Sequence, residues 1–370
     1  MSRWNKIAAS LISVFTVFAA VSCNKEYDFG FKDLCFYHPH TAPVRVDVDW
    51  SEFSHIEQPD GMTVYVWPEN SDEQMRTFVT HDISSITLDL KAGLFNAFVF
   101  NQSDGEFGSF DFYNLDEYDK AQVRVVESRT QYVTTKFPIT KVVNDPEWFA
   151  VDRIEDVKVT QDMVDFAEEE FLAAFRGTSE YKRSTPTKTQ IPVGTLVPKS
   201  VTKQIDFIIN LTNYKSLKTP VGYLGGLADG YYIASGKTTE GKITHSITFT
   251  ELKSKVDADT QKPDPVEAVL LATITTFGNP QGHTGLSSDN TLILEFTLRN
   301  GEVKELLFEV GDQIADLNTY DGTLKDDTGS PVWPKITLDV ELPFIEVNDD
   351  FFDVGVDDWG EEDETELPLN

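Results

Sequence analysis

The sequence has few cysteines and few basic residues for its length. Its 370 residues include two cysteines, and 62 acidic residues stand against 31 basic ones, which gives a net charge of −31. Two cysteines cannot build a disulfide-dense scaffold. A surface this acidic repels phosphate backbones, so we expect no nucleic-acid partner. The chain is long enough to fold without disulfides or metals, and about 150 residues per domain predicts two domains.

The motifs of common active sites are also missing. The glycine-rich stretch 222–230 lacks the Lys-Ser/Thr pair of a phosphate-binding loop, so we expect a series of turns there. Residues 38–40, His-Pro-His, have no cysteine or glutamate partner at zinc spacing. The pair at 81–82, His-Asp, has no serine in a Gly-x-Ser-x-Gly elbow to work with. We therefore predict a protein that is not an enzyme and that holds no cofactor or metal.

The N-terminus has the pattern of an export signal. Arg3 and Lys6 precede an uncharged, mostly apolar run from residue 7 to residue 21. This run has the length of a signal-peptide core and is shorter than the roughly 20 apolar residues that span a bilayer. It leads into Ala-Val-Ser before Cys23, which resembles a bacterial lipobox. We expect residues 1–22 to be a lipoprotein signal peptide and Cys23 to be the lipid attachment site. The alternatives are an ordinary secretory signal, in which Cys23 has no role, and a retained transmembrane helix.

Acyl chains on Cys23, such as palmitate, would hold the protein at a membrane. A thiolate is nucleophilic enough to form a stable thioether, and each buried methylene contributes about 0.8 kcal/mol to membrane binding. Residues 23–34 would form the tether, and its acidic residues resemble the surface-export signal of Bacteroidota lipoproteins. For Cys35, which lies in an apolar stretch, we expect a buried, unreactive thiol, with a catalytic nucleophile as the alternative.

The remainder of the chain has the pattern of an all-β protein. Residues 44–50 alternate strictly between apolar and polar, as in a strand with one solvent-exposed face. Similar short runs, separated by Gly, Pro, Asn and Asp, predict two antiparallel sandwiches, at residues 35–147 and 148–347. Further strands are expected at 62–67, 83–90, 95–101, 123–127, 205–211, 243–252, 268–277, 292–298, 306–310 and 336–342.

One helix is predicted, from Gln161 to Arg176. Apolar residues recur there about every 3.6 positions, and Gly177 follows as a stop signal. We expect this stripe to pack on a sheet edge or between sheets; it consists of Met163, Phe166, Ala167, Phe171, Ala174 and Phe175.

Two segments have a strong local charge. Residues 178–204 are basic, and their charges would either protect an exposed edge strand from aggregation or form a docking patch for an acidic partner. The basic residues of this segment are Lys182, Arg183, Lys188, Lys199 and Lys203. Residues 348–370 contain ten acidic residues and no basic one. They would form either a flexible, solvated tail or an interaction segment that folds onto a partner through its aromatic residues.

The start of the mature chain resembles a known family. The lipobox and tether are followed by Leu34-Cys35-Phe36-Tyr37-His38-Pro39-His40, which leads into the strand at 44–50. This arrangement resembles that of the Bacteroidales fimbrial-anchor-like lipoproteins, which are similar to the minor-fimbrium anchoring subunits of type V pili. The glycine-rich residues 221–236 resemble a strand pair in the second domain of that family. The resemblance implies two transthyretin-like β-sandwiches, an outer-membrane lipid anchor on Cys23 and a place at the base of a pilus.

The predicted function is that of a surface lipoprotein of the outer membrane that anchors or assembles a fimbrium, with fimbrial or pilin subunits as partners. A sandwich with an unpaired edge can accept a strand from another subunit. The alternative is a surface glycan-binding lipoprotein of a nutrient-uptake system. Exposed tryptophans would stack on sugars there. The candidates are Trp50, Trp67, Trp148 and Trp333, and the alternative for each is packing in the core.

Overall fold

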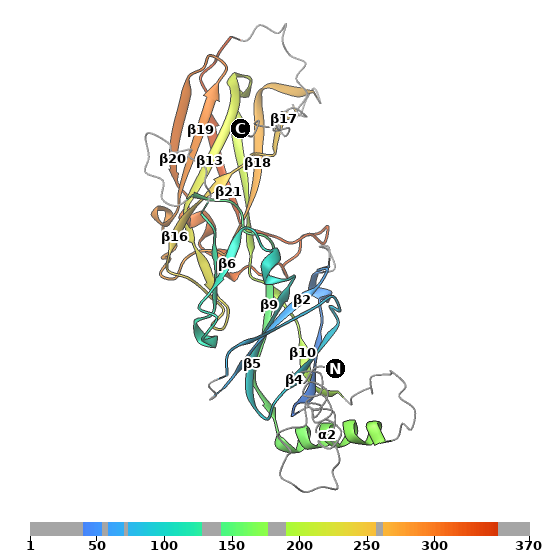
Figure 1. Cartoon of the computed structure of the whole chain (residues 1–370). Helices are drawn as coiled ribbons and strands as arrows, with labels where there is room; N and C mark the ends of the chain where they lie inside the picture. The colour runs from blue at the N-terminus through green and yellow to red at the C-terminus, as the bar shows by residue number, and fades with distance from the viewer. Residues whose placement is uncertain are drawn as a thin grey trace, which may run out of the picture. The chain divides into compact units, whose positions relative to one another are not determined.

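A computed structural model describes residues 40–53, 58–69, 73–127, 142–176, 190–256 and 262–346, without the side chains of residues 171–176. These residues form five β-sheets and the helix α2 (Figure 1), as expected for an all-β protein. They divide into two compact units. The smaller unit takes residues 40–46, 87–94, 157–176 and 190–194, and the larger unit takes the rest.

The smaller unit is built around a three-stranded sheet. Its order is β10 (Ile191–Leu196), β1 (Ala42–Val48) and β4 (Ser85–Leu90). Val44 and Val46 on β1 and Leu88 and Leu90 on β4 are buried, and a less buried residue lies between the members of each pair. The alternation that predicted strands at 44–50 and 83–90 is therefore confirmed, with β1 beginning two residues earlier than expected.

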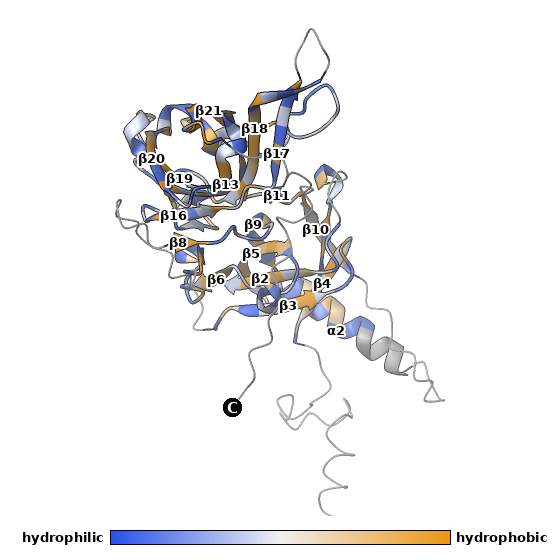
Figure 2. Cartoon of the chain, turned by 90° about the horizontal axis from the view of Figure 1, so that it is seen from above, coloured by the Kyte–Doolittle hydropathy of each residue, from blue (hydrophilic) through white to orange (hydrophobic). Residues whose placement is uncertain are grey.

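The helix α2 (Gln161–Arg176) has the predicted bounds. Thr160 caps it, because its Oγ1 accepts a hydrogen bond from the backbone N–H of Met163 at 3.3 Å. The predicted apolar stripe is wrong at Phe166, which is 49% exposed, whereas Val164 and Ala167 are buried. The i, i+3 spacing of those two residues defines the buried face, and Phe166 lies beside it. Figure 2 accordingly shows both hydrophobic and hydrophilic residues along α2.

The first part of the larger unit contains two sheets. One has the order β11 (Lys199–Ser200), β9 (Ala150–Val159), β5 (Gly93–Asn101), β2 (Met62–Pro68) and β3 (Arg76–Thr80). The other has the order β15 (Lys237–Thr238), β14 (Gly230–Tyr232), β7 (Gln122–Val125) and β6 (Phe110–Tyr113).

An aromatic core packs against these strands. The ring centroids of Phe107 and Phe110 are 4.4 Å apart, and those of Phe110 and Phe149 are 5.3 Å apart in an edge-to-face arrangement. Such pairs contribute about 0.5–1.5 kcal/mol beyond the burial of their area. The aromatic members of the buried cluster are Tyr65, Trp67, Phe98, Phe100, Phe107, Phe110, Phe149 and Phe277.

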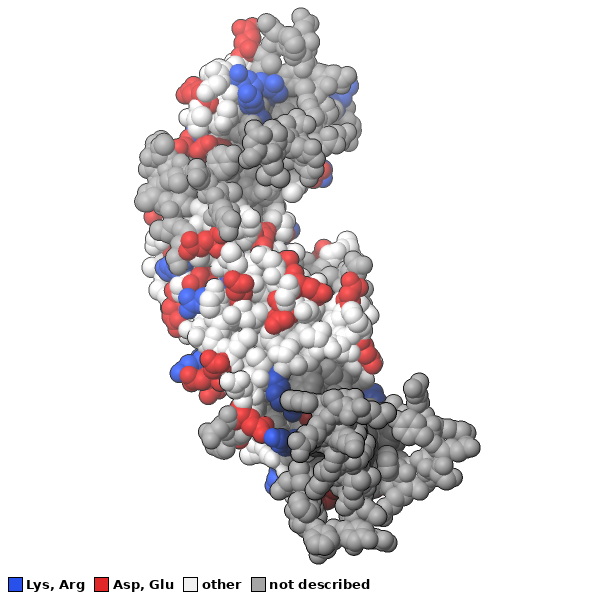
Figure 3. All heavy atoms as spheres, viewed as in Figure 1, with Lys and Arg blue, Asp and Glu red and all other residues white. Residues whose placement is uncertain are grey.

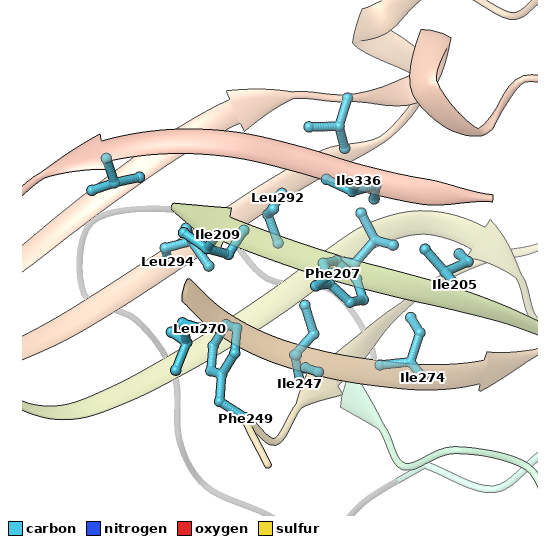
Figure 4. Packing of buried hydrophobic residues seen from close by; sticks show 14 of the residues in the cluster. Ile205, Phe207, Ile209, Ile247, Phe249, Leu270, Ile274, Leu292, Leu294 and Ile336 are labelled. Atoms are coloured by element: carbon cyan, nitrogen blue, oxygen red, sulfur yellow. The ribbon is translucent and has the colours of Figure 1, made fainter. Parts of the chain in front are cut away.

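The second part of the larger unit is a β-sandwich with an aliphatic core. One sheet has the order β17 (Glu251–Val256), β18 (Pro263–Thr276), β12 (Lys203–Thr212) and β21 (Lys335–Glu341). The other has the order β20 (Val303–Glu309), β19 (Thr291–Leu298), β13 (Leu217–Ala228), β16 (Lys242–Ile247) and β8 (Val142–Val143). Side chains from both sheets meet in one buried cluster (Figure 4), which includes Ile205, Phe207, Ile209, Leu270, Ile274, Leu292, Leu294 and Ile336.

Two short strands from the first half of the sequence pair with strands from the second half. β7 pairs antiparallel with β14, and β8 pairs parallel with β16. The last strand, β21, returns to pair parallel with β12 over Asp206–Thr212. Parallel pairing requires a long connection, so these contacts could not be predicted from local patterns.

The glycine-rich stretch 222–230 lies in strands β13 and β14, so the expected series of turns is wrong there. A bulge between Gly225 and Leu227 interrupts the pairing of β13 with β16. Gly226 has a φ of +89°, and a Cβ atom there would lie 2.2 Å from the carbonyl oxygen of Asp289. Glycine is thus required by close backbone packing at the bulge, which is a structural role.

Candidate functional site

Several residues of the predicted sites lie outside the described part of the chain. These are the signal peptide, Cys23, the tether, Cys35, His38, the basic residues Lys182, Arg183 and Lys188, and the acidic tail. The lipid attachment at Cys23 therefore stays a prediction. Within the described residues, we find no helix that is both long and apolar enough to cross a membrane.

Two of the four tryptophans considered as sugar platforms are core residues. Trp50 and Trp67 are 3% and 4% exposed, so for these two the core-packing alternative is correct and the platform role is excluded. Each donates its indole N–H to a backbone carbonyl, Trp50 to Ile83 at 2.9 Å and Trp67 to Leu115 at 2.7 Å. Trp148 and Trp333 are half-buried. Alternation along a strand shows that two faces differ, but not which face a second layer covers.

The other motifs show no active-site chemistry. His40 is exposed, and Nδ1 of His81 lies 3.3 Å from the backbone carbonyl oxygen of Asp60. Asp82 accepts hydrogen bonds from the backbone and the hydroxyl of Ser84, which lower the pKa of its carboxyl group. No group of three or more His, Cys, Asp or Glu side chains in the described ranges could hold a metal ion.

The strongest candidate for partner binding is the edge formed by β20. This strand is the last of its sheet and pairs with β19 over Val303–Glu309. Leu306 and Phe308 pack against the aliphatic core, while Val303 and Leu307 are 50% and 43% exposed. The Lys304 Nζ donates to the carbonyl oxygen of Glu341 at 2.7 Å, which ties β20 to the end of β21. The edge thus offers backbone groups that pair with no further strand among the described residues, beside exposed apolar side chains.

A pair of glutamates lies opposite each other near this edge. Glu295 on β19 and Glu305 on β20 are direct cross-strand partners. Burial, together with the negative charge of Glu305, raises the pKa of the Glu295 carboxyl group. Like charges directly opposite on neighbouring strands are destabilising. This pair therefore makes the pairing of β19 with β20 less stable.

An acidic pocket of about 570 Å³ lies beside the aromatic core. Trp67 and Tyr118 form its aromatic wall, with ring centroids 5.6 Å apart. The Tyr118 hydroxyl donates a hydrogen bond to Glu155 at 2.8 Å. The pKa of Tyr118 is raised, mainly by its burial and secondly by this hydrogen bond. The carboxylates that line the pocket are Glu69, Asp116, Glu117, Asp119, Glu155 and Asp156. On the face shown in Figure 3, acidic side chains likewise outnumber basic ones.

A second pocket, of about 510 Å³, has the opposite charge. Lys199, Lys203 and Lys237 line it, with Asp321 as the one carboxylate among its described lining residues. Lys199 and Lys203 belong to the basic segment 178–204. The structure places them in the same pocket as Lys237 of β15. Lys237 could not be predicted as part of this site, because only the fold places residue 237 next to residues 199 and 203.

Comparisons with known proteins agree with the all-β architecture. A candidate adhesin from Bacteroides ovatus is similar in structure, with a TM-score of 0.54 and 17% identity over 83% of this chain and 94% of that chain. The fimbrial anchor protein Mfa2 from Porphyromonas gingivalis is 14% identical with a TM-score of 0.39, over 75% of this chain and 84% of that one. The tip fimbrial protein Mfa3 from the same organism, truncated at its C-terminus, is 12% identical with a TM-score of 0.28, over 82% of this chain and 95% of that one.

Mfa2 is described as a fimbrial anchor protein, the kind of protein that the start of the mature chain resembles in sequence. The comparison with curated proteins yields no match. A family model described as "Domain of unknown function (DUF5119)" matches residues 23–249, which is more than half of the sequence. The chain therefore belongs to the DUF5119 family.

Proposed function

We propose that the protein is a surface lipoprotein of the outer membrane that anchors or assembles a fimbrium and joins its neighbours by β-strand addition. The observation that carries this proposal is the β20 edge. This strand has one sheet neighbour among the described strands, and its residues Val303 and Leu307 are exposed. A strand from another subunit would satisfy the free backbone groups and cover these side chains. The fold that the chain shares with a candidate adhesin supports the proposal. Strand addition needs no active site, cofactor or metal.

The lipid anchor is the second part of the proposal. Cys23 follows an apolar run of signal-peptide length, and the family match begins at the same residue, which supports cleavage before Cys23. We propose residues 1–22 as the signal peptide and residues 23–34 as the tether. Two transthyretin-like sandwiches, at 35–147 and 148–347, would follow, with the acidic tail at 348–370.

The anchor is tested by replacing Cys23 with alanine. Cys23→Ala should release the protein from the membrane fraction, because no thiol remains to carry lipid at that position. Cys35→Ala is the matched control and should leave the protein in the membrane. Acylated, membrane-bound C23A protein would contradict the assignment.

The β20 edge is tested by binding of purified fimbrial subunits to the immobilised protein. The double variant Val303→Lys/Leu307→Lys places charges along the strand, which should abolish retention of the subunits. Val256→Lys is the control, because Val256 is 61% exposed at the end of β17, the edge strand of the opposite sheet. Equal retention by the double variant would refute the edge assignment, and no retention by the unmodified protein would refute the fimbrial function itself.

A further inference from the structure

The lysine-lined pocket has a charge unlike that of the whole chain. Acidic residues outnumber basic ones two to one in the sequence, yet three lysines and a single carboxylate line the described wall of this pocket. They come from three places in the fold: Lys199 on β11, Lys203 at the start of β12 and Lys237 on β15. A local excess of cations in a concave site attracts small anions, even on an acidic protein, because distant charges are screened within about 10 Å.

Lys203 is the buried member of the three. Its side chain is 8% exposed, and its Nζ donates a hydrogen bond to the carbonyl oxygen of Tyr320. Burial lowers the pKa of Lys203, and attraction by Asp321 acts in the other direction. In the described part of the chain, no carboxylate oxygen forms an ion pair with Lys199, Lys203 or Lys237. Asp321 attracts both Lys199 and Lys203, but one carboxylate does not balance the charge of three ammonium groups, so an anion bound in the pocket would stabilise them.

The opposite side of the pocket consists of fixed polar groups. Asn318 Nδ2 donates to the Asn279 carbonyl at 2.9 Å, and Gln281 Nε2 donates to the Thr238 carbonyl at 2.7 Å. Asn279 is 1% exposed and donates from Nδ2 to the Ile314 carbonyl at 2.7 Å, while its Oδ1 has no hydrogen-bond partner among the described residues. These bonds fix the amides before any ligand arrives, and they leave a buried acceptor without a donor.

A glycine maintains the shape of this wall. Gly278 has a φ of +115°, and a Cβ atom there would lie 2.3 Å from Asn318 Oδ1. Any other residue would displace Asn318 and the bonds that it makes. Tyr231, which is half-buried, contributes an aromatic ring to the same pocket.

We propose that this pocket binds an acidic sugar, a hydroxylated carboxylate of the uronic or sialic acid type. The carboxylate would face the lysine ammonium groups, and the ring hydroxyls would bond the amides and hydroxyls of the wall. The volume lies in the range of small-ligand pockets, roughly 300–1,000 Å³. This site is separate from the β20 edge and does not depend on whether the protein assembles into a fimbrium.

The test is calorimetric titration of the protein, without its signal peptide, with four probes: glucuronic acid, N-acetylneuraminic acid, glucose and acetate. We expect at least one of the two acids to bind with a Kd of about 1 mM or tighter. Glucose should bind much more weakly, because it lacks the carboxylate, and acetate more weakly, because it lacks the hydroxyls. The two acids distinguish a uronate-type from a sialate-type ligand.

Exposed lysines provide variants that do not disturb folding. Lys199→Ala/Lys237→Ala should weaken binding of the acid by about tenfold or more, and added salt should weaken it further. Lys218→Ala, an exposed lysine on β13 outside the pocket, should bind as the unmodified protein does. The fold of each variant is checked by its urea midpoint.

Three results would overturn the proposal. They are no binding of either acid, equal binding of glucose, and unchanged affinity of the double lysine variant. Binding of a synthetic peptide of residues 348–370 in the absence of binding by either sugar acid would likewise refute it and assign the pocket to acidic peptides.

Discussion

The two sheets of the aliphatic sandwich end in edge strands that differ in their chemistry. On β17, Lys253 pairs with Glu251 at 2.6 Å within the strand and Lys255 pairs with Glu267 of β18 at 3.1 Å, so ion pairs occupy the strand up to Val256, the exposed residue at its end. On β20, Val303 and Leu307 are exposed within the strand, and Lys304 is engaged with the Glu341 carbonyl. Charged edges resist pairing with other strands, and apolar edges invite it. The difference teaches that side chains on the edge, rather than the shared core, decide which strand can accept a partner.

The largest effect is expected when the support under β20 is removed. Phe296 is fully buried in the core. It lies on β19, which is the only described strand that pairs with β20. Phe296→Ala should lower the free energy of unfolding by about 4 kcal/mol, because it deletes a buried ring and leaves a cavity. Urea unfolding measures this. The control is Thr297→Ala, at a half-buried residue on the other face of β19, which should lower the free energy of unfolding by less than about 1 kcal/mol. An equal loss in both variants would show that β20 is not supported from the core.

The comparison can be reversed by making β17 resemble β20. Lys253→Val/Lys255→Val removes both ion pairs and exposes apolar side chains on that edge, so the protein should self-associate as its concentration rises. Sedimentation velocity measures the fraction of dimers and larger species. The control Lys218→Val changes an exposed lysine on β13, a central strand, and should leave the protein monomeric. If the β17 variant also stays monomeric, charge is not what protects this edge.

The smallest effect concerns the glutamate pair of β19 and β20. Because the pKa of Glu295 is raised in the folded protein, the folded state holds that proton more tightly, and stability falls as pH rises through the raised pKa. Glu295→Gln removes the repulsion and should add about 0.5 kcal/mol at neutral pH. The gain should vanish in acid, at a pH below the raised pKa of Glu295, where its carboxyl group is protonated and no longer repels Glu305. Urea unfolding at the two pH values checks this, and a gain that persists in acid would exclude repulsion as its cause.

Period-2 alternation predicted the all-β class and many of the strands, but not the order of the strands in the sheets. Strands such as β1, β4 and β12 appear where apolar and polar residues alternate, and α2 has its predicted bounds because its capping and periodic signals are local. The parallel pairing of β21 with β12 was not predictable, because it joins residues more than a hundred positions apart. Phe166 was assigned to the wrong environment, and for Trp50 and Trp67 the choice between core and surface stayed open, because a pattern cannot say which face a second layer covers.

The candidate sites were less predictable than the fold. The basic segment pointed to Lys199 and Lys203, but Lys237 and the loop around Asn279 come from other parts of the sequence. The β20 edge was expected only as a type of feature. Which strand remains unpaired depends on the order of strands in the finished sheet, and no local signal encodes that order.

The most direct test of strand addition is amide hydrogen exchange in the presence and absence of a purified fimbrial subunit. The account predicts that backbone amides of Val303–Glu309 exchange more slowly in the complex, because the added strand satisfies them, while those of Glu251–Val256 are unchanged. A complex that forms with unchanged exchange along β20, or with protection of β17 instead, would contradict it.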